Sequence, residues 1–441
     1  MNRRFALLIG LGALLTGRLA SAQEVTIGYQ GLPYKSTGES NAGIQISDGV
    51  LLHTGIGVEA GYDTNVFYAS TKEIGSSIFR FMPFAELTNA TRTGATSNLL
   101  SFDARAGLQY RHYGNSEVSS RYSDAWNPNA GLSLSLGGAQ FGFGVADVFA
   151  RVEDAPYANP GNIDPVTGIP TGVPPIQRTN NQASIEGRWA PGGGRLTTVL
   201  RFTNMVNIYD DNGAGSYSYA NAMTNTLMLD VAWKWLPKTA IFLDVQQSIV
   251  SYLNQSQAAL NKLSDSYPLF VTGGLRGLLT EKTSAVLTLG YINGFYSSGA
   301  TTGGFLGSTY LDLAFTARLT QLSRAVAGFR HDFANAVISN FAYQETAYAS
   351  YVQQIAGRLA LDLSGRYQYI SYQGETADAN QMTPSGGNRI DNFFQLGASL
   401  DYFMRNWAYI GVGYALLDNR SNIPINDYLK QQVFARLGVT Y

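Results

Sequence analysis

Residues 100–111 read Leu-Ser-Phe-Asp-Ala-Arg-Ala-Gly-Leu-Gln-Tyr-Arg, and apolar and polar side chains alternate along this stretch. The even positions carry Leu, Phe, Ala, Ala, Leu and Tyr, whereas the odd positions carry Ser, Asp, Arg, Gly, Gln and Arg. Only an extended strand has a period of two, because its successive side chains point to opposite faces. The stretch therefore predicts a β-strand with one apolar face and one charged face.

The same alternation recurs along the chain, for example at residues 130–136, 227–235 and 359–363. A soluble sandwich could contain a few such strands, but this many predict an all-β fold, a transmembrane antiparallel up-and-down β-barrel. The strand at 341–353 is the least regular, which leaves sixteen strands as the alternative to eighteen. The eighteen predicted strands are 51–62, 77–88, 98–111, 125–136, 140–150, 180–190, 195–208, 222–235, 240–251, 266–279, 284–296, 308–319, 324–333, 341–353, 357–371, 389–403, 407–417 and 429–441.

Short and long connections alternate between these strands. Gly137-Gly138 and Pro237-Lys238 are short and rich in turn residues, whereas the proline-rich connection 151–179 is long. This alternation of connection lengths predicts short periplasmic turns, long outer loops and both termini in the periplasm. The loop at 151–179 could fold over the mouth or into the lumen as a constriction.

The first residues predict a cleavable secretory signal. Arg3 and Arg4 precede an apolar run at 5–15, and Ala20-Ser21-Ala22 forms a small-residue cleavage site. The apolar run is shorter than the roughly 20 residues that a spanning helix needs. We therefore expect a signal peptide at 1–22, a periplasmic segment at 23–49 and a barrel in the outer membrane of a Gram-negative bacterium at 50–441.

The composition fits this class of protein. Charged residues make up 14% of the chain, compared with about 25% in an ordinary soluble domain. The absence of cysteine excludes disulfides, thiolate metal sites and a lipoprotein anchor. A formal net charge of −1 gives no reason to expect nucleic acid as a partner.

Arginines and carboxylates gather on the inward parity of the predicted strands. A charge that faced lipid near the midplane would cost about 2–4 kcal/mol, so these residues identify the lumen face. They could form ion pairs that rigidify the wall, or line a hydrated conduit whose guanidinium groups bind carboxylates or sugar hydroxyls. The candidate pore-lining residues are Arg80, Glu86, Asp103, Arg105, Arg111, Arg188, Arg201, Arg276, Tyr310, Arg318 and Arg366.

Signals for enzymatic chemistry are sparse. The chain has three histidines, and His112 and His331 fall on the outward parity near strand ends. The acidic residues of loop 151–179 match no recognised calcium-loop spacing. We therefore expect no catalytic residues, no cofactor and no metal site.

The chain ends in alternating apolar residues and an aromatic residue: Val433, Ala435, Leu437, Val439 and Tyr441. This ending resembles the terminal-strand signal that the barrel-assembly machinery reads in Gram-negative outer-membrane proteins. We expect these five residues to act as the assembly signal, with outer-membrane lipid and that machinery as partners.

The exit of the first strand, Tyr62-Asp63-Thr64-Asn65-Val66, and the proline-containing second strand at 79–87 resemble the opening of the β-barrel porin 2 family. Members of that family are associated with exopolysaccharide biosynthesis operons. Asp63 and Asn65 also favour a tight turn where the strand leaves the membrane, and Tyr62 suits the interface. The resemblance covers about 35 residues and implies polysaccharide secretion with a periplasmic export protein as partner.

Three functions follow as hypotheses. The first is a passive conduit for a secreted polysaccharide that a periplasmic export protein delivers. The second is a general or substrate-selective porin for small-solute diffusion, and the third is a structural or adhesive surface barrel. An eighteen-strand barrel is wide enough for an aqueous channel, so its size is compatible with the first two hypotheses.

Overall fold

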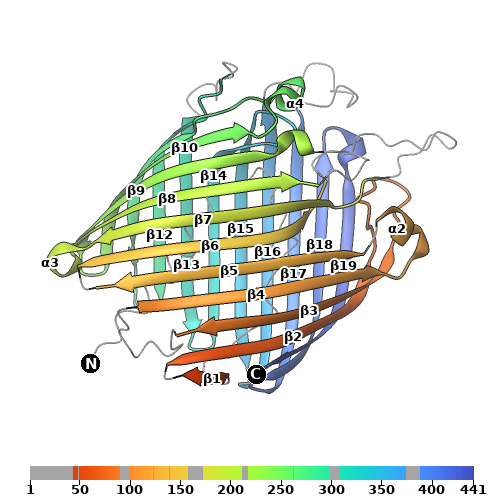
Figure 1. The fold of residues 1–441 in the computed structure, drawn as a ribbon, viewed down its shortest axis with the longest axis horizontal. Helices are drawn as coiled ribbons and strands as arrows, with labels where there is room; N and C mark the ends of the chain where they lie inside the picture. The colour runs from red at the N-terminus through yellow and green to blue at the C-terminus, as the bar shows by residue number, and fades with distance from the viewer. Residues whose placement is uncertain are drawn as a thin grey trace.

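A computed structural model gives the fold of the chain, which is a closed antiparallel β-barrel (Figure 1). It describes residues 43–47, 49–89, 100–122, 124–138, 140–156, 172–210, 217–261, 263–297, 308–373 and 388–441. The eighteen barrel strands are β2 (Val50–Asp63), β3 (Ser76–Thr88), β4 (Leu100–Tyr113), β5 (Ala125–Gly137), β6 (Phe141–Asp154), β7 (Ile176–Trp189), β8 (Leu196–Tyr209), β9 (Ala222–Leu236), β10 (Thr239–Tyr252), β11 (Leu269–Leu278), β12 (Thr283–Asn293), β13 (Thr309–Thr320), β14 (Ser323–Asn335), β15 (Phe341–Ile355), β16 (Leu359–Gln373), β17 (Ile390–Arg405), β18 (Ala408–Ser421) and β19 (Tyr428–Thr440).

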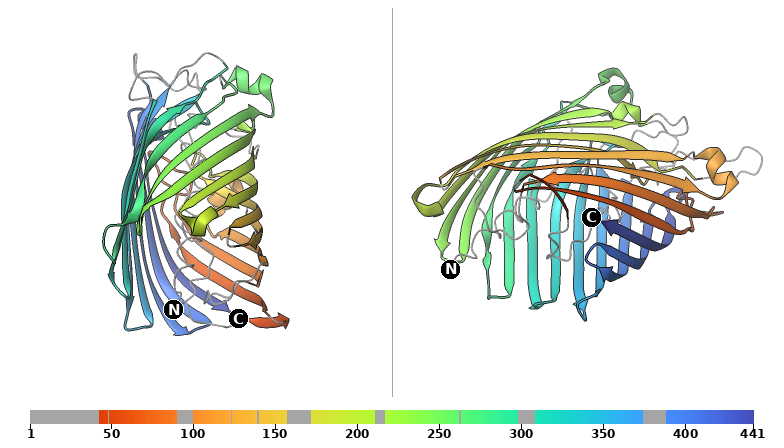
Figure 2. Two further views of the ribbon diagram at one scale, coloured as in Figure 1. Left: turned by 90° about the vertical axis from the view of Figure 1, so that its left-hand side faces the viewer. Right: turned by 60° about the horizontal axis from the view of Figure 1, so that its bottom comes forward.

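Each of these strands pairs with its neighbours in sequence, and β19 pairs with β2 to close the ring. The pairing runs from Gln432 opposite Asp63 to Thr440 opposite Gly55. Closure satisfies every strand edge, which is the condition for a sheet to span lipid. Figure 2 shows the resulting wall of steeply inclined strands from two further directions.

Helical structure is confined to the connections between strands. The described helices are α2 (Ser116–Arg121), α3 (Pro191–Gly194), α4 (Gln255–Leu260) and the 3-10 turns η1 (Ser218–Ala220) and η3 (Pro424–Asn426). In the described parts of the chain, no helix combines the length and apolar character that membrane crossing requires.

All eighteen predicted strands are present, so the alternative of sixteen strands is wrong. Strand β15, the irregular candidate, pairs along its length with β14 and β16. The largest boundary errors concern β6, β7 and β18, and β6 and β7 extend the predicted ranges 140–150 and 180–190 toward their shared loop. Polar residues such as Arg178 interrupt the alternation there, although the backbone pairing continues. The predicted signal peptide and residues 23–42 lie outside the described residues.

The segment before the barrel adds a short strand that the alternation does not predict. Strand β1 (Ile44–Ser47) turns back and pairs with Val50, Leu51 and Leu52 at the start of β2. Strand β19 pairs with β2 only from Gly55 onward. Strand β1 therefore covers the part of the β2 edge that the C-terminal strand does not reach.

The outer surface of the wall carries a band of exposed apolar side chains. Leu227 and Leu229 on β9, Leu396 on β17 and Val412 on β18 are examples, and between Leu227 and Leu229 the side chain of Met228 is buried. This strict division is the pattern that lipid outside and a lumen inside impose on a strand. The chain is therefore an outer-membrane β-barrel.

The predicted assembly signal lies on this lipid-facing surface. Val433, Leu437, Val439 and Tyr441 are all exposed, and the intervening residues of β19 point inward. The backbone of Tyr441 exchanges hydrogen bonds with Thr54 of β2, at 2.8 and 3.2 Å. The last residue of the chain thus belongs to the seam that closes the barrel.

Replacing Tyr441 by serine should lower the fraction of chains that reach the assembled state, because the terminal aromatic residue is the expected recognition element. Heat-modifiable migration on gels measures that fraction. Tyr402→Ser is the matched control, since Tyr402 is also an exposed tyrosine near the same rim, on β17. Equal assembly of the two variants would contradict the role assigned to Tyr441.

Candidate functional site: the lumen and its closed outer mouth

The lumen face of the wall is crossed by ion pairs between strands. Arg80 pairs with Glu59 at 3.1 Å, and Arg276 pairs with Asp230 at 3.2 Å. Arg201 pairs with Glu186 at 2.6 Å. Arg436 reaches Asp401 across β18, where Gly411 leaves the space for both side chains. Much of the inward charge therefore holds neighbouring strands together.

The remaining candidate lumen residues are distributed around the wall. Glu86 and Asp103 form a side-chain hydrogen bond, and Arg366 donates to the side-chain oxygen of Gln395 at 2.9 Å. Arg105 lies opposite Glu86 in the register of β3 and β4 and interacts electrostatically with that carboxylate. The sequence therefore predicts the inward face of these residues, but not which of them are paired.

Two candidates do not line accessible space. Arg111 lies on the inner side of β4 but is only 1% exposed, because it pairs with Glu153 and donates to the hydroxyl oxygen of Tyr122 at 3.1 Å. Tyr310 is 2% exposed and packs its ring 6.3 Å from that of Phe270. Their assignment as pore-lining residues is wrong for this structure, since packing near the outer end covers both side chains.

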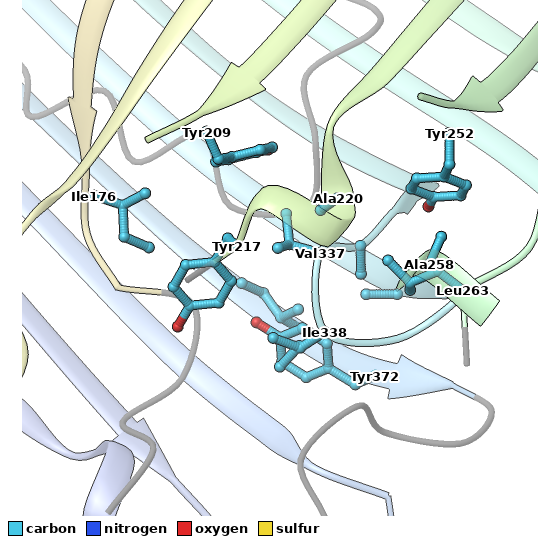
Figure 3. Close-up of a cluster of buried hydrophobic side chains, with 13 residues drawn as sticks. Ile176, Tyr209, Tyr217, Ala220, Tyr252, Ala258, Leu263, Val337, Ile338 and Tyr372 are labelled. Carbon is cyan, nitrogen blue, oxygen red and sulfur yellow. The ribbon is translucent and has the colours of Figure 1, made fainter. Parts of the chain in front are cut away.

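A cluster of thirteen buried side chains, which we call the mouth cluster, spans the outer mouth of the barrel (Figure 3). It joins residues of β7 to β10 with residues of β15 and β16. Strands β7 and β16 are nine positions apart in a ring of eighteen, so the cluster connects opposite walls. Its members are Ile176, Tyr209, Tyr217, Ala220, Tyr252, Ala258, Leu263, Ala336, Val337, Ile338, Ala342, Ile370 and Tyr372.

Outer loops supply the centre of this cluster. Tyr217 and Ala220 come from the β8–β9 loop, Ala258 from α4, and Val337 and Ile338 from the β14–β15 loop. A hydrogen bond of 3.3 Å between the side chains of Ser264 and Asn340 links two of these loops. Burial of large apolar side chains stabilises such packing by roughly 1.5–3 kcal/mol each. The mouth cluster is thus a packed layer rather than a chance proximity of loops.

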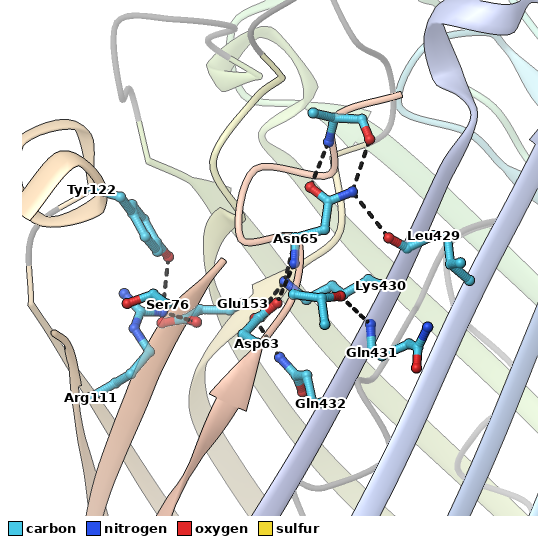
Figure 4. Close-up of polar contacts among 12 residues, drawn as sticks. Asp63, Asn65, Ser76, Arg111, Tyr122, Glu153, Leu429, Lys430, Gln431 and Gln432 are labelled. Atoms are coloured by element: carbon cyan, nitrogen blue, oxygen red, sulfur yellow. Dashed lines mark hydrogen bonds and ion pairs between the residues drawn. The ribbon is translucent and has the colours of Figure 1, made fainter. Parts of the chain in front are cut away.

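The other side of the mouth is fixed by a buried polar network at the barrel seam (Figure 4). The ammonium group of Lys430 on β19 lies 2.8 Å from Asp63 Oδ2 and donates to the backbone oxygen of Asn65 at 3.0 Å. Gln432 donates to the same carboxylate oxygen at 2.7 Å. We call Asp63, Asn65, Lys430 and Gln432 the seam network; all four are almost fully buried.

Asn65 organises the β2–β3 loop that leaves this network. Its backbone nitrogen donates to Asp63 Oδ1 at 3.0 Å, which confirms the predicted turn. Its side-chain amide donates to the carbonyl of Ala69 and accepts from the backbone nitrogen of Ala69, at 2.8 Å each. It also donates to the carbonyl of Leu429 at 3.1 Å. The turn is therefore also a clamp between the first and last barrel strands.

The mouth cluster and the seam network are connected. The guanidinium carbon of Arg389 lies 4.9 Å from the ring centre of Tyr372, and Arg389 pairs with Asp391 at 2.6 Å. The rings of Tyr428 and Tyr68 meet edge to face at 5.0 Å, and Lys430 Nζ lies 4.1 Å from the Tyr68 ring centre. Packed and paired groups therefore extend across the mouth from the mouth cluster to the seam.

Two groups outside the strands show that this layer is shielded from water. Burial raises the pKa of Tyr68 well above its ordinary value, so its hydroxyl stays neutral. Burial opposes the charge of Arg389, but the Asp391 carboxylate outweighs burial and raises the pKa of Arg389. Arg389 therefore remains charged and paired inside the layer.

The β6–β7 loop contributes to the same closure. The backbone nitrogen of Val173 donates to the carbonyl of Phe67 at 2.8 Å, and Ala155 packs in a cluster with Tyr68. The sequence left open whether loop 151–179 covers the mouth, and its two described ends lie against the β2–β3 loop. The acidic residues Glu153 and Asp154 are paired with arginines there. Residues 157–171 lie outside the described residues.

Replacing Lys430 by methionine should lower the free energy of unfolding by about 3–5 kcal/mol, because it leaves the Asp63 carboxylate buried without its cation. Urea unfolding followed by tryptophan fluorescence measures this loss. The control is Arg420→Met, since Arg420 pairs with Asp418 at 3.0 Å but its side chain is 73% exposed. That change should cost at most about 1 kcal/mol. Similar unfolding of the two variants would exclude a stabilising seam network.

Comparisons with known proteins give distant likenesses only. No family model matches the chain, and no curated protein matches it. The siderophore receptor PirA of Acinetobacter baumannii superposes with a TM-score of 0.42 at 8% identity, over 88% of this chain and 80% of that one. A mutant of the ferric enterobactin receptor of Pseudomonas aeruginosa gives a TM-score of 0.43 at 9% identity, over 88% of this chain and 81% of that one. The barrel fold follows from the strand pairing itself, and these likenesses add nothing about function.

Proposed function

We propose that the barrel is a gated outer-membrane conduit through which a polysaccharide leaves the cell. The single observation that carries the proposal is the mouth cluster, which joins opposite walls above a polar lumen. A porin for passive diffusion of small solutes needs an open mouth. A mouth that packed loops span suits a channel that acts only when its cargo and a periplasmic partner are present.

The lumen supports transport of a hydrophilic chain. Barrels of sixteen to eighteen strands enclose an aqueous channel. The inward side chains include exposed guanidinium groups, such as Arg105 on β4 and Arg318 on β13, which offer forked donors to hydroxyl or carboxylate oxygens. Paired charges elsewhere link neighbouring strands of the wall.

The resemblance to the β-barrel porin 2 family supports a polysaccharide as the cargo. The residues that carry it include Asp63 and Asn65, which form the seam network and the clamp on the β2–β3 loop. The motif therefore has a physical role in holding the mouth layer. A periplasmic export protein as the source of the polymer belongs to the same proposal.

A change that destabilises the mouth cluster should open the channel. Val337→Asp places a carboxylate at a position that is 6% exposed, and burying an unpaired charge costs several kcal/mol. Since about 1.4 kcal/mol corresponds to a factor of ten in an equilibrium, we expect open steps in planar bilayers at least about tenfold more often than with the unaltered chain.

Leu260→Asp is the control for this measurement. Leu260 lies on α4 beside the cluster but is 75% exposed, so a carboxylate there remains in water. Its conductance should equal that of the unaltered chain. If the unaltered chain already shows large, stable open steps, the small-solute porin becomes the better hypothesis.

Deletion of the gene tests the cargo. Cells that lack the protein should lose polysaccharide from their surface and retain it in the periplasm, and a plasmid copy should restore the surface polymer. Extraction and quantification of both polysaccharide fractions provide the measurement. Unchanged surface polymer in the deleted strain would overturn the export function.

A further inference from the structure

The inner wall between β3 and β6 contains a recess with a volume of about 350 Å³. This volume lies within the range of about 300–1,000 Å³ that is usual for small-molecule sites. The side chains that matter for its chemistry are Phe84, Arg105, Gln109, Asn127 and Asn129. All five belong to the inward parity of their strands, so the recess opens to the lumen.

An alternation of small and large residues across the strands creates this hollow. One inward row runs from Gly55 to Phe84, Gly107, Asn129 and Ala150 on successive strands β2 to β6. A methyl group added at Gly55 would lie 2.4 Å from the Phe84 ring, and one at Gly107 would lie 2.8 Å from the Asn129 amide. The small residues therefore allow the ring and the amide to lie against the wall.

In the neighbouring inward row, a glycine likewise leaves space for a large side chain, the guanidinium group of Arg105. Arg105 lies opposite Gly131 in the register of β4 and β5, and a methyl group at Gly131 would lie 2.7 Å from Arg105 Nε. On its other side Arg105 faces Glu86 of β3, which is hydrogen-bonded to Asp103. The arginine thus lies along the wall beside acidic neighbours, at the edge of the recess.

Several polar groups in the recess have unused hydrogen-bonding capacity. Asn127 is 5% exposed, and its Nδ2 donates to Glu153 at 2.8 Å, whereas its buried Oδ1 has no partner. Within the described part of the chain, the side chains of Gln109 and Asn129 make no hydrogen bond. A buried amide oxygen without a partner is costly, and a ligand that donates to it would remove that cost.

We infer that this recess is a saccharide-binding subsite in the lumen wall. Amide groups offer paired donors and acceptors to vicinal hydroxyls, Arg105 adds forked donors, and the Phe84 face suits the apolar side of a sugar ring. Acidic neighbours around Arg105 offset its charge and favour a neutral sugar over an acidic one. The inference rests on the proposed export function and assigns the part of the wall that contacts the polymer.

The test measures binding of two probes, maltohexaose and an oligogalacturonate, to the purified full-length barrel by isothermal titration calorimetry. We expect maltohexaose to bind, and its Kd to increase about tenfold or more in Asn129→Ala, which removes one amide. Gly107→Val should have the same effect, because its side chain displaces the Asn129 amide. Both variants are measured, so that a folding defect in one of them does not decide the test.

Arg318→Ala serves as the matched control for Arg105→Ala. Both arginines are exposed on the lumen face, and their strands β13 and β4 are nine positions apart, on opposite walls. The Arg105 variant should weaken maltohexaose binding, and the Arg318 variant should leave it unchanged. Absence of maltohexaose binding, tighter oligogalacturonate binding, or equal affinities in all variants would overturn the inference. Loss of surface polymer on gene deletion would then still support the conduit, so the two failures are distinguishable.

Discussion

The need to pair every backbone amide and carbonyl inside lipid governs this structure. An open sheet would leave two unpaired edges in the hydrocarbon layer, where each unsatisfied group costs several kcal/mol. The pairing of β19 with β2 removes both edges, and β1 covers the stretch of β2 that extends past the last residue. The paired arginines of the lumen face and the clamp at Asn65 then add side-chain contacts to a ring that the backbone has already closed.

The same constraint explains why the fold could be predicted from the sequence. Lipid on one side and a lumen on the other impose a period of two on every strand, and this pattern identified all eighteen strands and the inward side of the candidate residues. Segments outside the hydrocarbon layer are not required to alternate apolar and polar residues. The ends of β6 and β7 therefore continue through polar residues such as Arg178, where alternation gave no signal.

The closed mouth could not be predicted, for a related reason. Val337, Tyr217 and Ala258 lie in loops without periodicity, and their contacts depend on how three separate loops fold toward one another. The pairing of Arg436 with Asp401 was equally hidden, because it reaches across a whole strand over Gly411. Asp63 and Asn65 showed their turn chemistry in the sequence, but their partner Lys430 is more than 360 residues away along the chain.

That separation along the chain has a consequence for the order of folding. The β2–β3 loop obtains the buried cation Lys430 from β19, the strand that closes the ring, so the seam side of the mouth cannot assemble while the barrel is still open. An incompletely inserted chain would therefore lack this part of its outer closure. Closure of the barrel wall and completion of the seam network are therefore one event, because both require β19.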